Sequence, residues 1–193
     1  MITYFEELLR ILENSLESVD EQMFFDLVSQ STEVLENGGK IIVSGLGKNV
    51  PVCEKFVGTL TSLGLKASYM NTDSAVHGDL GMVCDEDLVL LLTKSGETIE
   101  SVHLYNLLRQ RECKIWLLSF EQHSTLADAI DTKIILDLEH EGDAWNLVPN
   151  NSTTVNLIVL QMLAMRIAAT MDIKLDTFRR NHPGGHIGDI LNA

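Results

Sequence analysis

The stretch KIIVSGLGKNV, residues 40–50, joins an apolar run to a helical pattern through a glycine-containing turn. Residues 40–45 are rich in Ile and Val, and a helical pattern follows near residues 50–63. Gly45 and Gly47 allow the backbone between them to turn tightly and to approach a ligand. A strand, a short turn and a helix in this order form the repeating unit of parallel α/β sheets.

The same order recurs along the chain. Further β-rich runs lie at residues 65–70, 87–93, 113–119 and 132–138. Helical patterns lie near residues 97–111 and 124–129, and a long one begins at about 152. The β-rich runs are nearly continuous in Ile, Val and Leu, which is typical of strands covered on both faces. We therefore predict the α/β class, as a three-layer α/β/α sandwich around a five-stranded parallel sheet.

Two amphipathic helices precede this pattern. Apolar residues recur with helical spacing from Phe5 to Leu16 and from Met23 to Leu35, and Gly38-Gly39 marks the end of the second helix. We find no repeat or linker. The sequence predicts one domain over residues 1–193, with an N-terminal helical segment (1–38) and an α/β core with a C-terminal tail (39–193).

Composition narrows the class of partner. The 193 residues carry a formal net charge of −14, so we expect no nucleic acid partner. An anionic small molecule would need local positive potential from backbone N–H groups and placed lysines. The start of the chain lacks the basic residues of a signal peptide, and the apolar run 155–171 is slightly short for a membrane span. Cys53, Cys84 and Cys113 form no disulfide or zinc pattern, so we expect reduced core cysteines in a cytoplasmic protein.

Ligands of parallel α/β sheets bind at the carboxyl ends of the strands, so the loops that follow the strands are the candidate sites. The first loop contains Ser44, Gly45, Gly47 and Lys48, and Lys48 lies where the next helix begins. Neither the GxxxxGK nor the GxGxxG spacing is present. The loop is either a tight turn with a solvated lysine or part of an anion site.

The second loop is TKSGETIES, residues 93–101, in which hydroxyl side chains surround Gly96. A structural interpretation makes Ser95 a helix N-cap and places Glu97 in the first helical turn. A functional interpretation makes Ser95, Gly96 and Thr98 a phosphate cradle, with Glu97 as a base beside it. The residues alone leave both open.

Other candidates lie in further loops. The carboxylates of residues 139–143, Glu141 among them, are either a solvated face or the source of a base. His77 lies in a glycine-containing turn just before the third β-rich run, residues 87–93. His182 precedes Pro183-Gly184-Gly185 near the end of the chain, where it either caps a turn or reaches an active site.

Five motifs in order resemble those of the sugar isomerase (SIS) domain, and within it the arabinose 5-phosphate isomerases. They are SGLGKN, HGDLGMV, TKSGET, VPNNSTT and HPGGHIG, and the resemblance covers roughly residues 35–191. HGDLGMV and HPGG favour this branch. The resemblance implies a flavodoxin-like strand order, a phosphosugar substrate, a homodimer or homotetramer, and no metal or other cofactor.

The resemblance also implies roles for single residues. Lys48 matches the lysine of the family's GxGK loop, Glu97 the glutamate of SGE, and Glu141 the acidic residue eight positions before the proline of xPxxST. His77 matches the histidine of HGD, and His182 that of HPGG. An aldose–ketose isomerase of this kind needs a base over C1 and C2, which is Glu97 or Glu141. It also needs a group to stabilise the enediolate oxygen, which is Lys48 or a histidine, and a phosphate anchor such as Ser44, Ser95 and Thr98.

Some positions depart from the family pattern. Lys94 replaces a small residue before SGE, Asn49-Val50 replaces SG after the loop lysine, and His186 follows HPGG. Many bacterial members continue after HPGG with paired CBS domains, whereas this sequence ends at Ala193, so we expect no regulation through such domains. The alternatives are a 6-phospho-3-hexuloisomerase and a non-catalytic phosphosugar-binding sensor.

Overall fold

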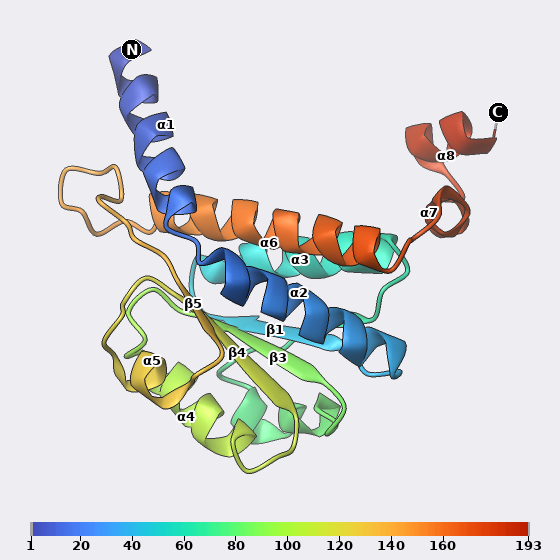
Figure 1. The fold of residues 1–193 in the computed structure, drawn as a ribbon, viewed down its shortest axis with the longest axis horizontal. Coiled ribbons are helices and arrows are strands. Elements are labelled where there is room, and N and C mark those ends of the chain that lie inside the picture. The colour runs from blue at the N-terminus through green and yellow to red at the C-terminus, as the bar shows by residue number, and fades with distance from the viewer. Residues whose placement is uncertain (1, 193) are drawn as a thin grey trace.

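The computed structural model describes residues 2–192 and has a five-stranded sheet at its centre (Figure 1). The strands are β1 (Ile41–Gly45), β2 (Ala67–Tyr69), β3 (Leu88–Leu92), β4 (Lys114–Ser119) and β5 (Lys133–Ile135). All neighbouring strands are parallel, in the order β2-β1-β3-β4-β5. This order is the flavodoxin-like one. The predicted sheet is therefore confirmed.

Helices cover both faces of the sheet, which confirms the three layers (Figure 1). One face carries α1 (Ile2–Glu17), α2 (Glu21–Glu36), α3 (Asn49–Ser62) and α6 (Asn151–Thr170). The other face carries α4 (Ile99–Leu108), α5 (Thr125–Ala129) and two short 3₁₀ helices, η1 (Ala75–His77) and η2 (Asp79–Met82). The 3₁₀ helices occupy the segment around His77, for which we predicted only a turn.

Strand β3 shows why the β-rich runs lack alternation. Leu88, Leu90 and Leu92 pack into the core beneath α2, α3 and α6, whereas Val89 and Leu91 pack beneath α4 and α5. All five side chains are buried. Successive side chains of a strand point to opposite faces, so a strand covered on both sides needs apolar residues throughout.

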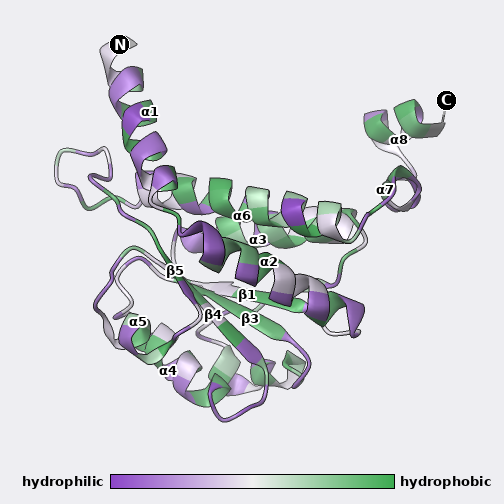
Figure 2. Cartoon of the chain, viewed as in Figure 1, coloured by the Kyte–Doolittle hydropathy of each residue, from purple (hydrophilic) through white to green (hydrophobic). Residues whose placement is uncertain are grey.

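Helix α6 is the main helix of its layer and packs against α1, α2 and α3. It is long and apolar enough, at a mean hydropathy of 1.4, to meet a composition test for a membrane span. Nine of its residues are buried by the rest of the fold. Core helices of globular proteins can reach the same length and hydropathy, so these two properties alone are weak evidence for a membrane span. Much of α6 is green in Figure 2, and its Met162 and Met165 are exposed.

Two segments project from opposite ends of the molecule (Figure 1). At one end is the start of α1, and at the other are α7 (Leu175–Asn181) and α8 (Gly185–Asn192). The side chain of Asn181 donates a hydrogen bond to the Ser62 carbonyl, which fixes α7 to the C-terminal end of α3. The HPGG segment is therefore a junction between two short helices.

The cysteines are free, as expected, but not all belong to the core. Cys53 and Cys113 are buried, and burial raises the pKa of the Cys53 thiol to about 12. Cys84 is exposed, so the expectation of a core position is wrong for that residue. It lies in the loop between η2 and β3, beside Asp85 and Glu86, which are also exposed.

Candidate functional site

A pocket of about 230 Å³ lies at the carboxyl ends of β1 and β3. The β1–α3 loop contributes Gly47 and Lys48, and the β3–α4 loop contributes Thr93, Lys94, Ser95 and Thr98. The first turns of α6 contribute Ser152, Thr153 and Asn156. Three of the loops that the sequence singled out therefore meet at one place, as the parallel sheet requires.

The β1–α3 loop is shaped by its glycines. A Cβ atom at Gly45 would come within 3.0 Å of the Asn49 Cβ and 3.2 Å of the Cys53 Sγ, so the strand can pass this close to α3 only without a side chain. Lys48 occupies the N-cap position of α3 and is exposed. Its ammonium group is thus available to an anion in the pocket.

The β3–α4 loop is held by its own hydroxyl groups. Thr93 Oγ1 accepts a hydrogen bond from Gly96 N at 3.2 Å, and Ser95 Oγ accepts one from Glu97 N at 3.2 Å. Helix α4 begins at Ile99 with Thr98 as N-cap, so the alternatives that made Ser95 the N-cap and Glu97 part of the first turn are wrong. Thr98 makes no capping hydrogen bond through its side chain, which leaves the first N–H groups of α4 to favour an anion at the pocket.

The carboxylate of Glu97 points to α5 and does not line the pocket. Its Oε1 accepts a hydrogen bond from Thr125 N at 2.6 Å, and its Oε2 accepts one from the Thr125 hydroxyl at 2.8 Å. These two bonds, from the backbone first and then from the hydroxyl, hold the pKa of Glu97 below its ordinary value. Glu97 therefore ties the β3–α4 loop to the first turn of α5.

Glu141 is fully buried directly behind the pocket. Its Oε1 lies 2.7 Å from the Lys94 Nζ and accepts a hydrogen bond from the Ser152 hydroxyl at 2.7 Å. Its Oε2 accepts hydrogen bonds from the backbone N–H groups of Asn150 and Ser152, each at 3.0 Å. Burial alone would raise the pKa of this carboxyl, but Lys94, Ser152 and Asn150 together hold the pKa below its ordinary value.

Positively charged side chains line the pocket in a protein of net charge −14. Lys48 and Lys94 line it, and the only described carboxylate in contact with either of them is Glu141, which lies behind the wall. Uncapped N–H groups at α4 add partial positive charge. The pocket therefore contains the kinds of group that an anionic ligand would need, namely lysines and free backbone N–H groups.

Other predicted site residues lie elsewhere. Ser44 is buried beneath the loop, where its hydroxyl pairs with that of Thr72 at 2.8 Å. His77 is exposed at the end of η1 and does not line the pocket. Gly45 and Gly96 shape the loops without lining the pocket themselves.

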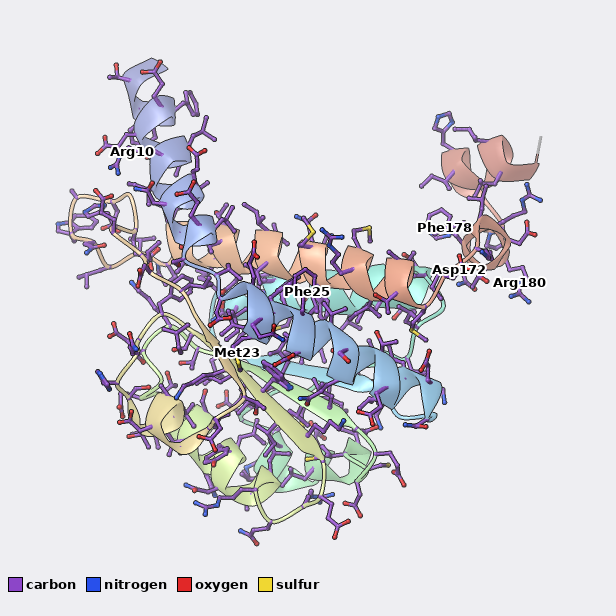
Figure 3. All side chains as sticks on the ribbon, viewed as in Figure 1. Arg10, Met23, Phe25, Asp172, Phe178 and Arg180 are labelled. Carbon is purple, nitrogen blue, oxygen red and sulfur yellow. The ribbon has the colours of Figure 1, made fainter. Side chains whose placement is uncertain are left out.

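His182 lies at the opposite end of the molecule from the pocket. It follows α7, which contacts Ser62 at the end of α3, whereas Lys48 precedes the start of α3. A 14-residue helix is about 20 Å long, so His182 and the pocket of its own chain are separated by that length. The ring of His182 stacks on that of Phe178, with 3.9 Å between the ring centroids. Figure 3 shows Phe178 far from Arg10. The guanidinium of Arg10 pairs with Glu139 of the β5–α6 loop, which leads into α6.

Several pocket residues are not evident from the sequence. Ser152, Thr153 and Asn156 lie inside or just after the VPNNSTT motif, but the motif alone gave them no role. Lys94 stands out in the sequence only as a departure from the family pattern. Its position beside Ser95, in a loop that follows a strand, is the feature of the sequence that could have placed Lys94 in the pocket. Its pairing with Glu141 depends on the tertiary fold.

A family model describes this architecture. The SIS domain matches residues 34–166, which is more than half of the chain, so the protein belongs to the SIS domain family. The match begins in α2 and ends within α6, and it includes the three loops that line the pocket.

Individual relatives give more detail. An uncharacterised protein of Chlamydia pneumoniae is 36% identical over 161 residues, 83% of this chain and 49% of its own length. The arabinose 5-phosphate isomerase KdsD of Pseudomonas aeruginosa is 32% identical over 166 residues, 86% of this chain and 51% of its own. The structure of E. coli CFT073 c3406 in complex with a phosphosugar has a TM-score of 0.85 at 27% identity, over 93% of this chain and 94% of that one. The chain spans about half the length of the curated relatives it matches.

Proposed function

We propose that this protein is a phosphosugar aldose–ketose isomerase that interconverts D-arabinose 5-phosphate and D-ribulose 5-phosphate. The observation that carries the proposal is a buried, ionised carboxylate, Glu141, directly behind a small pocket that is lined by two lysines and several hydroxyls. The similarity to KdsD of P. aeruginosa and to the phosphosugar complex of c3406 supports the choice of substrate.

The phosphate is expected at the start of α4. Ser95 and Thr98 line the pocket there, and the uncapped N–H groups of α4 favour a dianion. Lys48, across the pocket, is then placed near the carbon chain. Binding energy from the phosphate would orient C1 and C2 for reaction.

The reaction moves one proton between neighbouring carbons. A base removes the C2 proton of the aldose, the C2–H electrons form the C1–C2 double bond, and the carbonyl electrons move to O1, which takes up a proton. The enediol then loses the O2 proton, re-forms a carbonyl at C2 and receives a proton at C1. Lys48 would stabilise the developing negative charge on oxygen. The net change requires no oxidant and no reductant.

Glu141 is the preferred base, because it contacts the pocket-lining residues Lys94 and Ser152. Both oxygens of Glu97 are bonded to Thr125, away from the pocket. Glu97 is therefore the second candidate.

We propose further that His182 acts in the pocket of a neighbouring subunit. The position of α7 at the far end of α3 separates it from the pocket of its own chain. Its Nδ1–H donates to the Phe178 carbonyl at 2.8 Å, so Nε2 of the neutral ring is left as an acceptor for a sugar hydroxyl. Exposed apolar residues on α1, α2 and α6, such as Leu9, Phe25 and Met162, suit contact between copies.

We propose a cytoplasmic location as well, because the three cysteines are free.

The test is an isomerase assay of the purified protein with D-arabinose 5-phosphate, following ribulose 5-phosphate, with Glu141→Gln as the matched variant. We expect turnover that falls by at least about a hundredfold in the variant. Tight binding without turnover would favour the sensor alternative. The supporting observation is that every carboxylate oxygen of Glu97 and Glu141 already accepts a hydrogen bond. Turnover only with a 3-hexulose 6-phosphate would favour the hexuloisomerase.

A further inference from the structure

The inference concerns Lys94 and rests on the proposed isomerase function. We propose that Lys94 is a positioning residue that holds Glu141 ionised in the free protein and exchanges this carboxylate for the bound phosphosugar. The exchange would leave Glu141 Oε1 free to accept the substrate proton.

The hydrogen bonds of Glu141 show why an exchange is needed. The carboxylate receives two donors at Oε1, from Lys94 and Ser152, and two at Oε2, from the backbone N–H groups of Asn150 and Ser152. A carboxylate has about four acceptor positions. With all of them occupied, it cannot take a proton from carbon until one donor leaves.

Lys94 is the donor that is able to leave. Its side chain is 41% exposed and lines the pocket, whereas Glu141 is fully buried. Ser152 is buried in the first turn of α6, and the remaining donors are backbone groups of residues 150 and 152. These three are fixed by the helix; the lysine is held by side-chain torsions only.

An anion in the pocket gives Lys94 a second partner. Lys94 is flanked by Ser95, and both residues line the pocket with Thr98 at the start of α4. A phosphate bound there lies on the same loop as the ammonium group. The exchange would keep the Lys94 ammonium paired with a negative group throughout, so its charge stays compensated.

The other charged groups around Glu141 are already engaged or differently placed. On its own loop, Glu139 pairs with Arg10 of α1, Asp143 accepts three backbone N–H groups of residues 145–148, and His140 Nδ1 accepts from Gly142 N. Glu7 of α1 lines a separate cavity with His140 and Asp143. Lys48 lines the pocket from the α3 side. Within residues 2–192, Lys94 is the only cation within ion-pair distance of Glu141.

The first experiment is the pH dependence of kcat/KM and kcat for the wild type, Lys94→Gln, Lys94→Arg and, as a control, Lys48→Gln. Loss of Lys94 should move the acid limb of kcat/KM to higher pH by about one unit, a tenfold loss at any pH on that limb. Lys94→Arg should restore the position of the acid limb. Lys48→Gln should lower the plateau of kcat/KM without moving its acid limb. In the wild type, the acid limb of kcat should lie above that of kcat/KM, because Lys94 has left Glu141 in the complex. An acid limb that is the same in Lys94→Gln and the wild type would overturn the proposal.

A second experiment does not require turnover. The carboxyl resonance of Glu141 is followed by ¹³C NMR in the wild-type chain, assigned by its loss in Glu141→Gln, and titrated with pH with and without inorganic phosphate. We expect phosphate to raise the pH of its titration. No turnover together with this rise would reject the isomerase function but retain the exchange; no change with phosphate would reject the exchange even in an active enzyme.

Discussion

Glu97 and Thr125 form a two-point contact, in which the backbone N–H and the hydroxyl of Thr125 donate to the two carboxylate oxygens at 2.6 and 2.8 Å. The contact joins the β3–α4 loop to the first turn of α5. A glutamate at the N-terminus of a helix favours the ionised state. Of the two candidate bases, Glu97 is thus the one whose carboxylate is bonded away from the pocket.

Glu97→Gln is therefore expected to reduce kcat/KM by about tenfold or less, far below the 10²- to 10⁴-fold effect of losing a general base. Its pKa is lowered in the folded protein, so the stability it contributes is present above its unfolded pKa and is lost as the pH falls through the folded value. Thermal unfolding between pH 7 and pH 3 should show a shallower acid decline in the variant than in the wild type. A thousandfold loss of kcat/KM at unchanged stability would instead identify Glu97 as the base.

Gly96 has a φ of +67°, and a Cβ atom there would lie 2.0 Å from the Ser124 Oγ, which caps α5. Gly96→Ala should lower the free energy of unfolding by about 2–4 kcal/mol and weaken sugar phosphate binding, because strain and overlap add. Gly38→Ala is the matched control: its φ is +90° and no atom lies within 4 Å of a Cβ there. This control should cost about 1 kcal/mol and leave binding unchanged. Urea unfolding and calorimetric titration measure both quantities, and equal effects of the two variants would contradict the overlap.

Asp87 lies directly before β3, at the end of the strands opposite the pocket. It is buried and accepts hydrogen bonds from Lys40 N at 2.9 Å, Lys40 Nζ at 2.6 Å and Cys84 N at 2.8 Å. Asp87→Ala should lower the free energy of unfolding by about 3 kcal/mol, because it leaves these donors without a partner. It should not change the Kd for sugar phosphate, since the pocket lies at the other ends of β1 and β3. Glu33→Gln, at the exposed ion pair with Lys114, is the control, with an expected change under about 0.5 kcal/mol.

The position of His182 predicts complementation between chains. Lys48→Gln and His182→Ala should each be nearly inactive alone. When the two are co-expressed, half of the dimers are mixed and contain one intact site, which restores about a quarter of wild-type activity. Assays of the unseparated co-expressed mixture measure this, and mixed dimers isolated by differential tags should reach about half of wild-type activity. If the mixed oligomer is no more active than either variant, His182 does not act across subunits.

The sequence by itself determined the layers of this fold. Continuous Ile, Val and Leu runs such as residues 88–92 can be satisfied only with cover on both faces, and the helical spacing between the runs supplies that cover. The same pattern predicts that the loops after the strands lie together at the carboxyl ends of the sheet, and Lys48, Ser95 and Thr98 line one pocket there. These features depend on residues near one another in the chain.

The tertiary structure decided which charged groups meet. Lys94 and Glu141 come from different loops, after β3 and after β5, and Glu97 and Thr125 are 28 positions apart. No local pattern fixes such pairs, because they depend on how far each loop extends and which way its side chains turn. The structure also decided that His182 is separated from the pocket of its own chain, since α7 is anchored to the far end of α3 by Asn181. The sequence thus supplied the chemical groups, and long-range packing determined which of them can act together.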